Sequence, residues 1–260
     1  MEAVLTLLIP VVFVVSLIVE RIFPARKLPK VRFWLLKGFI FFFISGAINA
    51  IVPAVMTPVL APLSVVPGAK LGIALGAILT LLLAELFGYG LHRFMHRVQF
   101  VWRWTHQMHH SAERVDIAGA AYLHPLDITL QVFPLTLAAT ILGVSPDAAA
   151  LAGFLSFLMA MFQHLNVRTP QWVGWVVQRP EGHSVHHQRG VHAYNYGNLA
   201  IWDLVFGTFR NPKDFAPEAG FYDGASSRTF AMLIGRDVGE PAVAVETAKE
   251  VAPSLEVAKA

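Results

Sequence analysis

Long apolar runs dominate the amino-acid sequence and predict membrane-spanning helices. A helix needs about 20 mostly apolar residues to cross a bilayer, because the hydrocarbon core is roughly 30 Å thick and each helical residue rises about 1.5 Å. Residues 3–19, 38–56 and 71–91 meet this requirement. Residues 57–69 are rich in proline, so we expect a short turn or a re-entrant segment there.

Two further apolar runs are shorter and close together. Residues 128–144 and 148–163 flank Ser145-Pro146-Asp147, which is typical of a tight turn, and neither run has length to spare. We therefore expect a helical hairpin that either crosses the membrane or only enters it. The whole pattern predicts an all-α integral membrane protein with four to five transmembrane or re-entrant helices.

The basic residues between these runs predict the orientation of the helices. They follow the first run, the third run and the hairpin, whereas the turn after the second run has none before Lys70. The excess of Lys and Arg in cytoplasmic loops places the amino terminus outside and the basic segments inside. The first run lacks a preceding basic segment and a cleavage site, so we expect an uncleaved anchor. Without a Lys-rich carboxy-terminal retrieval signal, we expect a bacterial inner membrane.

The composition supports a membrane protein and excludes several other classes. Hydrophobic residues make up 55% of the 260 residues and charged residues 14%, well below the roughly 25% usual in soluble domains. The absence of cysteine excludes disulfides, thiolate metal sites and cysteine nucleophiles. Since the basic residues flank apolar runs, the net charge of +3 does not indicate a nucleic-acid partner. We expect one domain, residues 1–234, followed by a flexible tail, residues 235–260.

Histidines occur in three groups at helical spacing. One group has spacing i, i+4, and two have spacing i, i+3, i+4: His92 and His96; His106, His109 and His110; His183, His186 and His187. These spacings place the imidazoles of each group on one helix face. Neutral imidazole is the commonest protein ligand for Zn, Fe, Cu and Ni. Because the basic residues place all three groups on one side of the membrane, we predict a metal centre in a cytoplasmic, histidine-rich helical cap.

The number of histidines is right for two metal ions. One ion takes about four to six ligands, and the three groups offer eight. His164, at the end of the hairpin, is a ninth candidate, which would give two ions four or five nitrogens each. His124, just before the hairpin, is either a tenth ligand or a residue that contacts a ligand. His192 stands outside the groups, and we expect a structural role for it and a mild effect of its substitution.

Alternative roles for the histidines are less consistent with this pattern. A single histidine on an apolar helix is usually a hydrogen-bonded core residue, but a helix face offers too few acceptors for eight adjacent rings. A haem would need one histidine on each of two helices rather than three on one. A pH sensor built from packed imidazoles stays open as an alternative.

The order of the histidine groups resembles that of a known family. The segments His92-Arg93-Phe94-Met95-His96, His106-Gln107-Met108-His109-His110 and His183-Ser184-Val185-His186-His187 look like the three histidine boxes of the fatty acid hydroxylase/sterol desaturase superfamily. The later segments Asn195-Tyr196-Gly197, Trp202-Asp203 and Phe206-Gly207-Thr208 are similar to the segment after the last box in its bacterial and alkylglycerol-monooxygenase-like members. The likeness covers about residues 82–211, half of the chain.

This resemblance implies a membrane-bound di-iron oxygenase. The boxes and His164 would bind two non-haem iron ions, which zinc can replace in purified protein. O2 would be the co-substrate, and the substrate would be an unactivated C–H bond of a membrane lipid such as a fatty acyl chain or a sterol. The chain has no His-Pro-Gly-Gly haem signature, so electrons would come from a separate ferredoxin- or cytochrome-type donor with its reductase.

Two acidic residues are candidate catalytic residues. Glu85 lies seven residues before His92, where the family usually has an acidic residue, and on the same helix face. We expect it to accept a hydrogen bond from that ring and fix its tautomer, with an ion pair to a basic residue as the alternative. Asp203 would do the same for the last histidine group or cap a turn. The role of Asp127 is ambiguous from the sequence.

Three other activities stay open. A desaturase could use the same site to remove a second hydrogen. A zinc hydrolase could use the same nitrogens, although no His-Glu-x-x-His motif supplies a carboxylate base. A metal transporter would place its polar ligands deep within several spans, whereas these histidines lie at the cytoplasmic margin.

Overall fold

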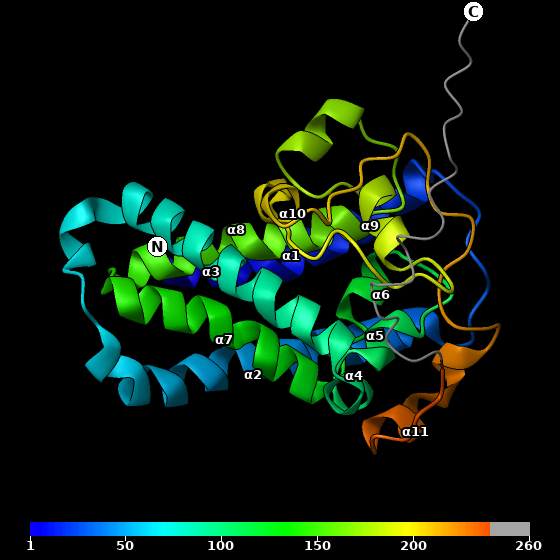
Figure 1. Ribbon diagram of the computed structural model, residues 1–260, viewed down its shortest axis with the longest axis horizontal. Helices are drawn as coiled ribbons and strands as arrows, with labels where there is room; N and C mark the ends of the chain where they lie inside the picture. Colours follow the sequence, from blue (N-terminus) through cyan, green and yellow to red (C-terminus); the bar gives the residue numbers. More distant parts are fainter. Residues whose placement is uncertain (240–260) are drawn as a thin grey trace, which may run out of the picture.

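The computed structural model describes residues 1–239, which form an all-helical protein. Five helices are long and apolar enough to cross a membrane: α1 (Glu2–Ile22), α2 (Trp34–Leu60), α3 (Gly72–Arg97), α7 (Pro125–Leu142) and α8 (Pro146–His164). They run along the long axis of the molecule, and most of the short helices gather at one end (Figure 1). The chain is an integral membrane protein, and the predicted fold class is confirmed.

Helix α3 lies at the centre of the bundle. It packs against both halves of the hairpin, α7 and α8, while α2 packs on α7 and α1 packs on α8. An apolar core fills the space between the bundle and the short helices. In that core Phe13 stacks on Phe42 at 4.1 Å, and Tyr122 lies 5.2 Å from Trp34 between ring centroids.

The second span is longer than the sequence predicts. Helix α2 continues through Pro53 and Pro58 to Leu60 and is followed by the 3-10 helices η1 (Ala61–Leu63) and η2 (Gly68–Leu71). A membrane-spanning helix tolerates proline because neighbouring helices and small local adjustments satisfy the backbone groups that proline leaves free. The proline-rich residues therefore extend the helix before the chain turns.

The hairpin consists of two helices of full spanning length. The turn between them begins at Gly143, whose φ of 57° is left-handed, and the Ser145 hydroxyl accepts a hydrogen bond from the Ala148 N–H, which caps α8. The amino terminus lies at the same end of the bundle, because the Met1 amino group is 3.4 Å from the Asp147 carboxylate. The histidine groups lie at the other end.

The cap at the histidine end, residues 98–124 and 165–239, is built from short helices. They are α4 (Gln99–Trp104), α5 (Gln107–His110), α6 (Ile117–Ala121), η3 (Gln171–Trp175), α9 (Pro180–His186), α10 (Ala200–Val205), η4 (Ala225–Arg228) and α11 (Thr229–Leu233). The first residues of the predicted tail pack on this cap: Val238 is buried, and the Gln107 side chain donates to the Arg236 carbonyl at 2.8 Å. The rest of that tail, residues 240–260, lies outside the residues described.

Candidate metal centre

Nine histidines bring their ring nitrogens together in two groups. Within each group, one nitrogen of every residue lies within 4.8 Å of the others. The first group contains His92, His96, His106, His110 and His186, and the second contains His109, His164, His183 and His187. Each group draws on residues far apart in the sequence, so the tertiary fold has to form before either group exists.

The two boxes of three histidines are each divided between the groups. In α5 and its N-cap, His106 and His110 belong to the first group and His109 to the second. Around α9 the division is reversed, with His183 and His187 in the second group and His186 in the first. Residues four apart on a helix point in nearly the same direction, whereas successive residues point about 100° apart. Each short helix therefore serves both groups.

The spacing between ring nitrogens fits metal coordination. The Nε2 atoms of His92 and His106 are 2.8 Å apart, and His164 Nε2 lies 3.2 Å from His109 Nε2 and 3.1 Å from His183 Nε2. A metal with bonds of about 2.0–2.1 Å to nitrogen holds neighbouring ligands about 3 Å apart. In the first group the Nε2 atoms of His96, His110 and His186 are buried without a hydrogen-bond partner. Buried polar atoms of this kind are expected where a metal binds.

The electrostatic environment keeps the imidazoles in the form that binds metal. Burial lowers the pKa of His109, His110, His183, His186 and His187 well below 6.5, and the neighbouring imidazoles lower it further. These rings are therefore neutral at pH 7, and a neutral ring can donate a lone pair to a metal.

The outer nitrogens of four histidines have hydrogen-bond acceptors. Each acceptor lies 2.7 Å from an Nδ1 atom: the Tyr196 carbonyl from His92, the Asp127 carboxylate from His106, the Ala160 carbonyl from His164, and the Tyr194 carbonyl from His186. An Nδ1–H that donates to these oxygens leaves Nε2 as the free lone pair. The acceptors thus fix the tautomer and the orientation of each ring.

Asp127 is the carboxylate in direct contact with a candidate ligand. It is fully buried at the start of α7, and its second oxygen accepts a hydrogen bond from Gln131 Nε2 at 2.7 Å. The sequence left this residue ambiguous, because nothing in its spacing from His106 on another helix shows that the two side chains meet.

Glu85 and Asp203 both contact one loop, residues 194–198, which we name the carbonyl loop. Glu85 accepts from the backbone and side-chain N–H groups of Asn198, at 3.0 and 2.9 Å, instead of from His92 as expected from the sequence. Asp203 accepts from the N–H groups of Tyr196 and Gly197, at 2.9 and 2.8 Å. Neither carboxylate bonds directly to a histidine, because the carbonyl loop lies between them.

The carbonyl loop supplies acceptors for the first group. Its Tyr194 and Tyr196 carbonyls bond to His186 and His92. Tyr194 and Asn195 have φ angles of 70° and 48°, in the left-handed region that non-glycine residues rarely adopt. Asn195 holds this conformation by donating from Nδ2 to the carbonyls of Gly182 and Arg210 at 2.8 and 2.9 Å. The strained loop is therefore tied to α9 on one side and to residues beyond α10 on the other.

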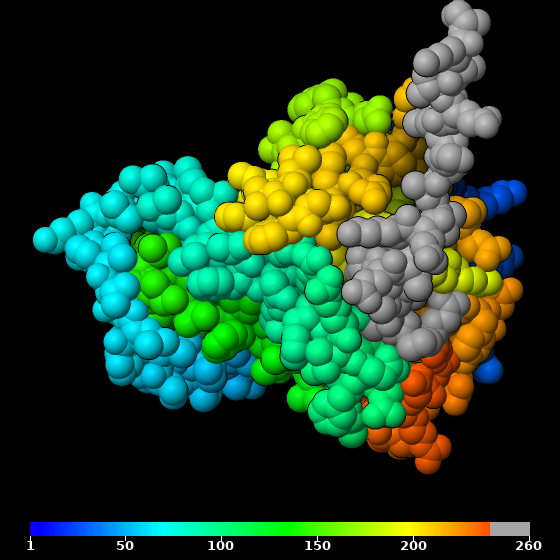
Figure 2. All heavy atoms as spheres, viewed as in Figure 1, coloured from blue at the N-terminus to red at the C-terminus, as the bar shows by residue number. Residues whose placement is uncertain are grey.

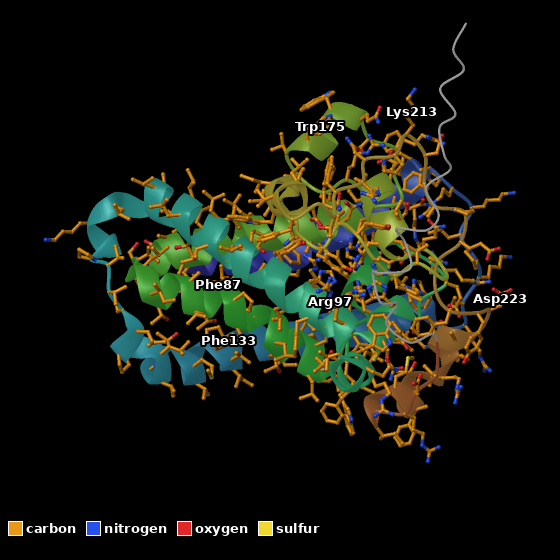
Figure 3. All side chains as sticks on the ribbon, in the orientation of Figure 1. Phe87, Arg97, Phe133, Trp175, Lys213 and Asp223 are labelled. Atoms are coloured by element: carbon orange, nitrogen blue, oxygen red, sulfur yellow. The ribbon has the colours of Figure 1, made fainter. Side chains whose placement is uncertain are left out.

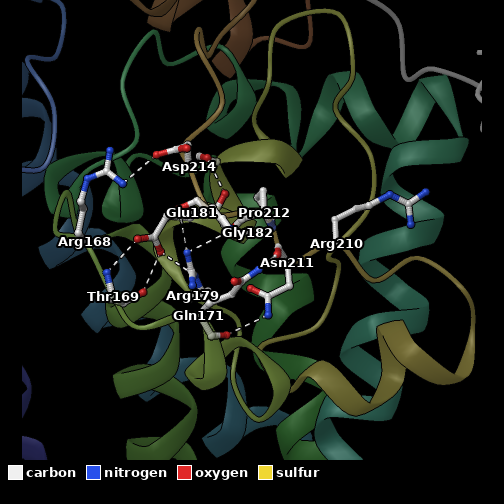
Figure 4. Close-up of polar contacts among 12 residues, drawn as sticks. Arg168, Thr169, Gln171, Arg179, Glu181, Gly182, Arg210, Asn211, Pro212 and Asp214 are labelled. Atoms are coloured by element: carbon white, nitrogen blue, oxygen red, sulfur yellow. Dashed lines mark hydrogen bonds and ion pairs between the residues drawn. The ribbon is translucent and has the colours of Figure 1, made fainter. Parts of the chain in front are cut away.

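A buried ion pair fixes the start of α9. Arg179 Nε lies 2.8 Å from Glu181, and both side chains are 1% exposed. Glu181 also accepts from the N–H and hydroxyl of Thr169, and Arg179 donates to the Pro212 carbonyl (Figure 4). These contacts hold the helix that carries histidines of both groups.

Two remaining histidines have different positions from those the sequence suggested. His124 lies outside both groups: its Nδ1 accepts from the Leu126 N–H at 3.0 Å and caps α7, and Nε2 lies 3.3 Å from the Leu233 carbonyl. His192, which the sequence placed apart from the site, is 1% exposed with its Nδ1 3.1 Å from Nδ1 of His110. No regular spacing links His192 to the boxes, so the sequence offered no signal for this contact.

Comparison with known proteins agrees with this geometry. The family model described as fatty acid hydroxylase matches residues 77–208, half of the chain, including all nine grouped histidines. The chain belongs to the fatty acid hydroxylase family. No solved structure matches it.

The names of several curated relatives refer to different lipids. Ornithine lipid hydroxylase OlsE of Rhizobium tropici is 30% identical over 54% of this chain and 43% of its own length. Sphinganine C4-monooxygenase 1 of Arabidopsis thaliana is 22% identical over 59% of this chain and 61% of its own, and alkylglycerol monooxygenase of Xenopus tropicalis is 29% identical over 52% and 31%. The chain thus spans about half the length of the first of these relatives.

Proposed function

We propose that the chain is a di-iron oxygenase that hydroxylates an unactivated C–H bond of a membrane lipid, using O2 and electrons from a separate donor protein. The observation that supports this most is the pair of groups of five and four histidine nitrogens at one end of a five-helix membrane bundle. The groups adjoin one another, because the rings of His110 and His187, one from each group, stack at 4.2 Å. Two ions bound there would be close enough to act together.

The residues present are suited to iron. Imidazole binds iron and zinc well, and His92, His96, His106, His110 and His186 would hold one ion, with His109, His164, His183 and His187 holding the other. When bound, the iron pair would supply the oxidising chemistry for an alkyl C–H bond, which no side chain can provide. The chain's own part is to present neutral nitrogens, to fix their tautomers through Asp127 and the carbonyl loop, and to bury them away from water.

The position of the site supports a lipid substrate. The histidine groups lie where α3 and α8 end. The acyl chain of a lipid in the adjacent leaflet is therefore the nearest large substrate. The relatives' names include an ornithine lipid, sphinganine, alkylglycerol and a sterol, which share the class of membrane lipid. We also propose that the histidine end faces the cytoplasm of a bacterial inner membrane, where the donor protein would reach it.

Elemental and product analysis of the purified protein tests this proposal. We expect iron-supplied protein in lipid nanodiscs to bind about two irons per chain, one for each histidine group. With a reductant and isotopically labelled O2, a lipid should gain one labelled oxygen atom, and the His109→Ala and His186→Ala variants should each lose about half of the bound metal and most of the activity. If the lipid gains no oxygen and only loses two hydrogen atoms, the protein would be a desaturase instead of a hydroxylase. Zinc-loaded protein that hydrolyses lipid without O2 would overturn the oxygenase.

A further inference from the structure

Two neighbouring segments of the cap expose large apolar side chains. On η3 and the residue after it these are Trp172 (70% exposed), Trp175 (60%) and Val176 (61%), and on α10 and the residue after it they include Ile201 (46%), Val205 (63%) and Phe206 (46%). We name these six residues the apolar patch. A soluble surface rarely groups so many large apolar side chains unless something covers them.

The apolar patch is a built surface, because the two segments are joined through their backbones. The Ala200 N–H donates to the Val176 carbonyl at 3.1 Å, and a bridge pairs Val177 with Leu199. The Trp175 ring also lies 5.1 Å from Phe209, which follows α10. The backbone contacts therefore hold the apolar residues of both segments together on one surface.

This surface lies alongside the spanning part of α3 rather than beyond its end. Phe206 stacks on Tyr89 at 4.9 Å, and Asn198, just before α10, bonds to Glu85. Tyr89 and Glu85 precede Arg97, the last residue of α3, by eight and twelve residues, which corresponds to about 12 and 18 Å along a helix. Helix α10 (yellow in Figure 2) lies on the surface against α3, and Trp175 lies near the level of Arg97 along the long axis (Figure 3).

The charges around the apolar patch have the pattern of a membrane interface. Residues 171–177 contain no charged residue, and the only one in residues 200–208 is Asp203, which is fully buried. Exposed basic residues flank the patch, among them Arg210, Lys213 and Arg168, which forms an ion pair with the exposed Asp214. Tryptophan and basic residues are enriched where proteins meet lipid headgroups, and helices with one apolar face lie in that interface.

We propose that the apolar patch is inserted among the acyl chains of the leaflet beside α3, with the flanking basic residues at the headgroups. This insertion seats the cap on the membrane and holds the histidine groups at the leaflet surface, next to the chains that a lipid substrate would provide. The proposal concerns the membrane contact and does not depend on which metal binds or which reaction takes place.

The absence of cysteine makes a direct test practical. The chain has none, so Trp175→Cys and Val205→Cys each create a unique site for a spin label in the full-length protein. The labelled protein is reconstituted into phosphatidylcholine/phosphatidylglycerol vesicles, and collision with O2, which concentrates in lipid, is compared with collision with a water-soluble nickel chelate. Val14→Cys, on the exposed face of α1 within the bilayer, and Asp223→Cys, whose side chain is 95% exposed on the cap, are the matched references.

The proposal expects the labels at 175 and 205 to resemble the Val14 reference rather than the Asp223 reference. The ratio of O2 collisions to chelate collisions should be severalfold higher at 175 and 205 than at 223. Labels that match the Asp223 reference would overturn it, and so would labels that become shielded only when a soluble electron-donor protein is added. Metal content equal to the unsubstituted protein shows that each variant is folded. Ile201→Cys, on the same surface, replaces either variant that fails this control.

Discussion

Asp127 Oδ2 lies 2.7 Å from Nδ1 of His106, and the two side chains are 0% and 2% exposed. The opposite ring nitrogen, His106 Nε2, lies 2.8 Å from Nε2 of His92 in the first histidine group. The carboxylate would therefore act on a metal bound by the first group through the imidazole, by fixing the tautomer and the orientation of the ring.

We predict that Asp127→Asn weakens metal binding or activity about 10–100-fold, the usual cost of losing such a contact. The amide cannot serve both neighbours, because Gln131 Nε2 and His106 Nδ1–H are both donors and the amide offers only one acceptor oxygen. The fraction of metal that stays bound in the presence of a chelator measures the effect. Asp223→Asn, at an exposed carboxylate on the same cap, should behave like the unsubstituted protein. Equal retention by both variants would show that the carboxylate has no role in the site.

The contact between His192 and His110 predicts an effect that the sequence did not. His192→Ala removes the neighbour 3.1 Å from the outer nitrogen of His110, and we expect a loss of metal from the first group and about 10-fold lower activity. His124→Ala is the matched control, because it removes a buried histidine outside both groups. It should keep its metal and lose about 0.5–2 kcal/mol of stability through the lost cap of α7. Metal analysis and thermal unfolding of both variants distinguish these outcomes. Loss of metal in His124→Ala and retention of metal in His192→Ala would contradict both assignments.

The membrane fold and the histidine boxes were predictable because each depends on local sequence. An apolar run of spanning length has few alternatives to a helix, and spacing of three and four residues places side chains together on a helix whatever its surroundings. The end of α2 was predicted too early, since Pro53 and Pro58 stop helices in water but not in lipid.

The contacts around the candidate metal site were not predictable because they join distant segments. The acceptor for His106 is on another helix, and the acceptors for His92 and His186 are carbonyls of a loop whose left-handed residues are not glycines. Because every residue has a backbone carbonyl, the sequence does not indicate which carbonyl will accept a hydrogen bond from a histidine. Glu85 was correctly singled out as unusual within a span, but its partner Asn198 is 113 positions away.

The division of the last box between the two groups predicts separate effects for two histidines of α9. His183→Ala removes a nitrogen from the second group, and His186→Ala removes one from the first. We expect each variant to lose about half of the bound metal, with most activity lost in both because the proposed reaction would need the pair of ions. Metal content combined with iron spectroscopy should show a different remaining ion in each variant. The same remaining ion in both variants would contradict the assignment of these histidines to separate groups.

The carbonyl loop predicts that Glu85 and Asp203 act together although they do not touch the histidines. Glu85 holds the loop at Asn198 and Asp203 holds it at Tyr196 and Gly197, so either substitution, Glu85→Gln or Asp203→Asn, should release the Tyr196 carbonyl from His92. Once one contact is lost the loop has already moved, and losing the second costs less. We therefore expect the double variant to lose less activity than the product of the two single losses, with a coupling of about 0.5–3 kcal/mol.

A double-mutant cycle measures this coupling, with metal content and activity determined for the four proteins at one pH. Glu85→Gln paired with Asp223→Asn is the control cycle, since Asp223 lies on the surface of the cap and should give independent effects. The single variants should also lose more activity than metal, because the ligands stay in place while the ring of His92 loses its fixed orientation. Independent effects of Glu85 and Asp203 would mean that the two carboxylates stabilise separate structures, and the carbonyl loop would then no longer explain why the sequence carries an acidic residue within α3.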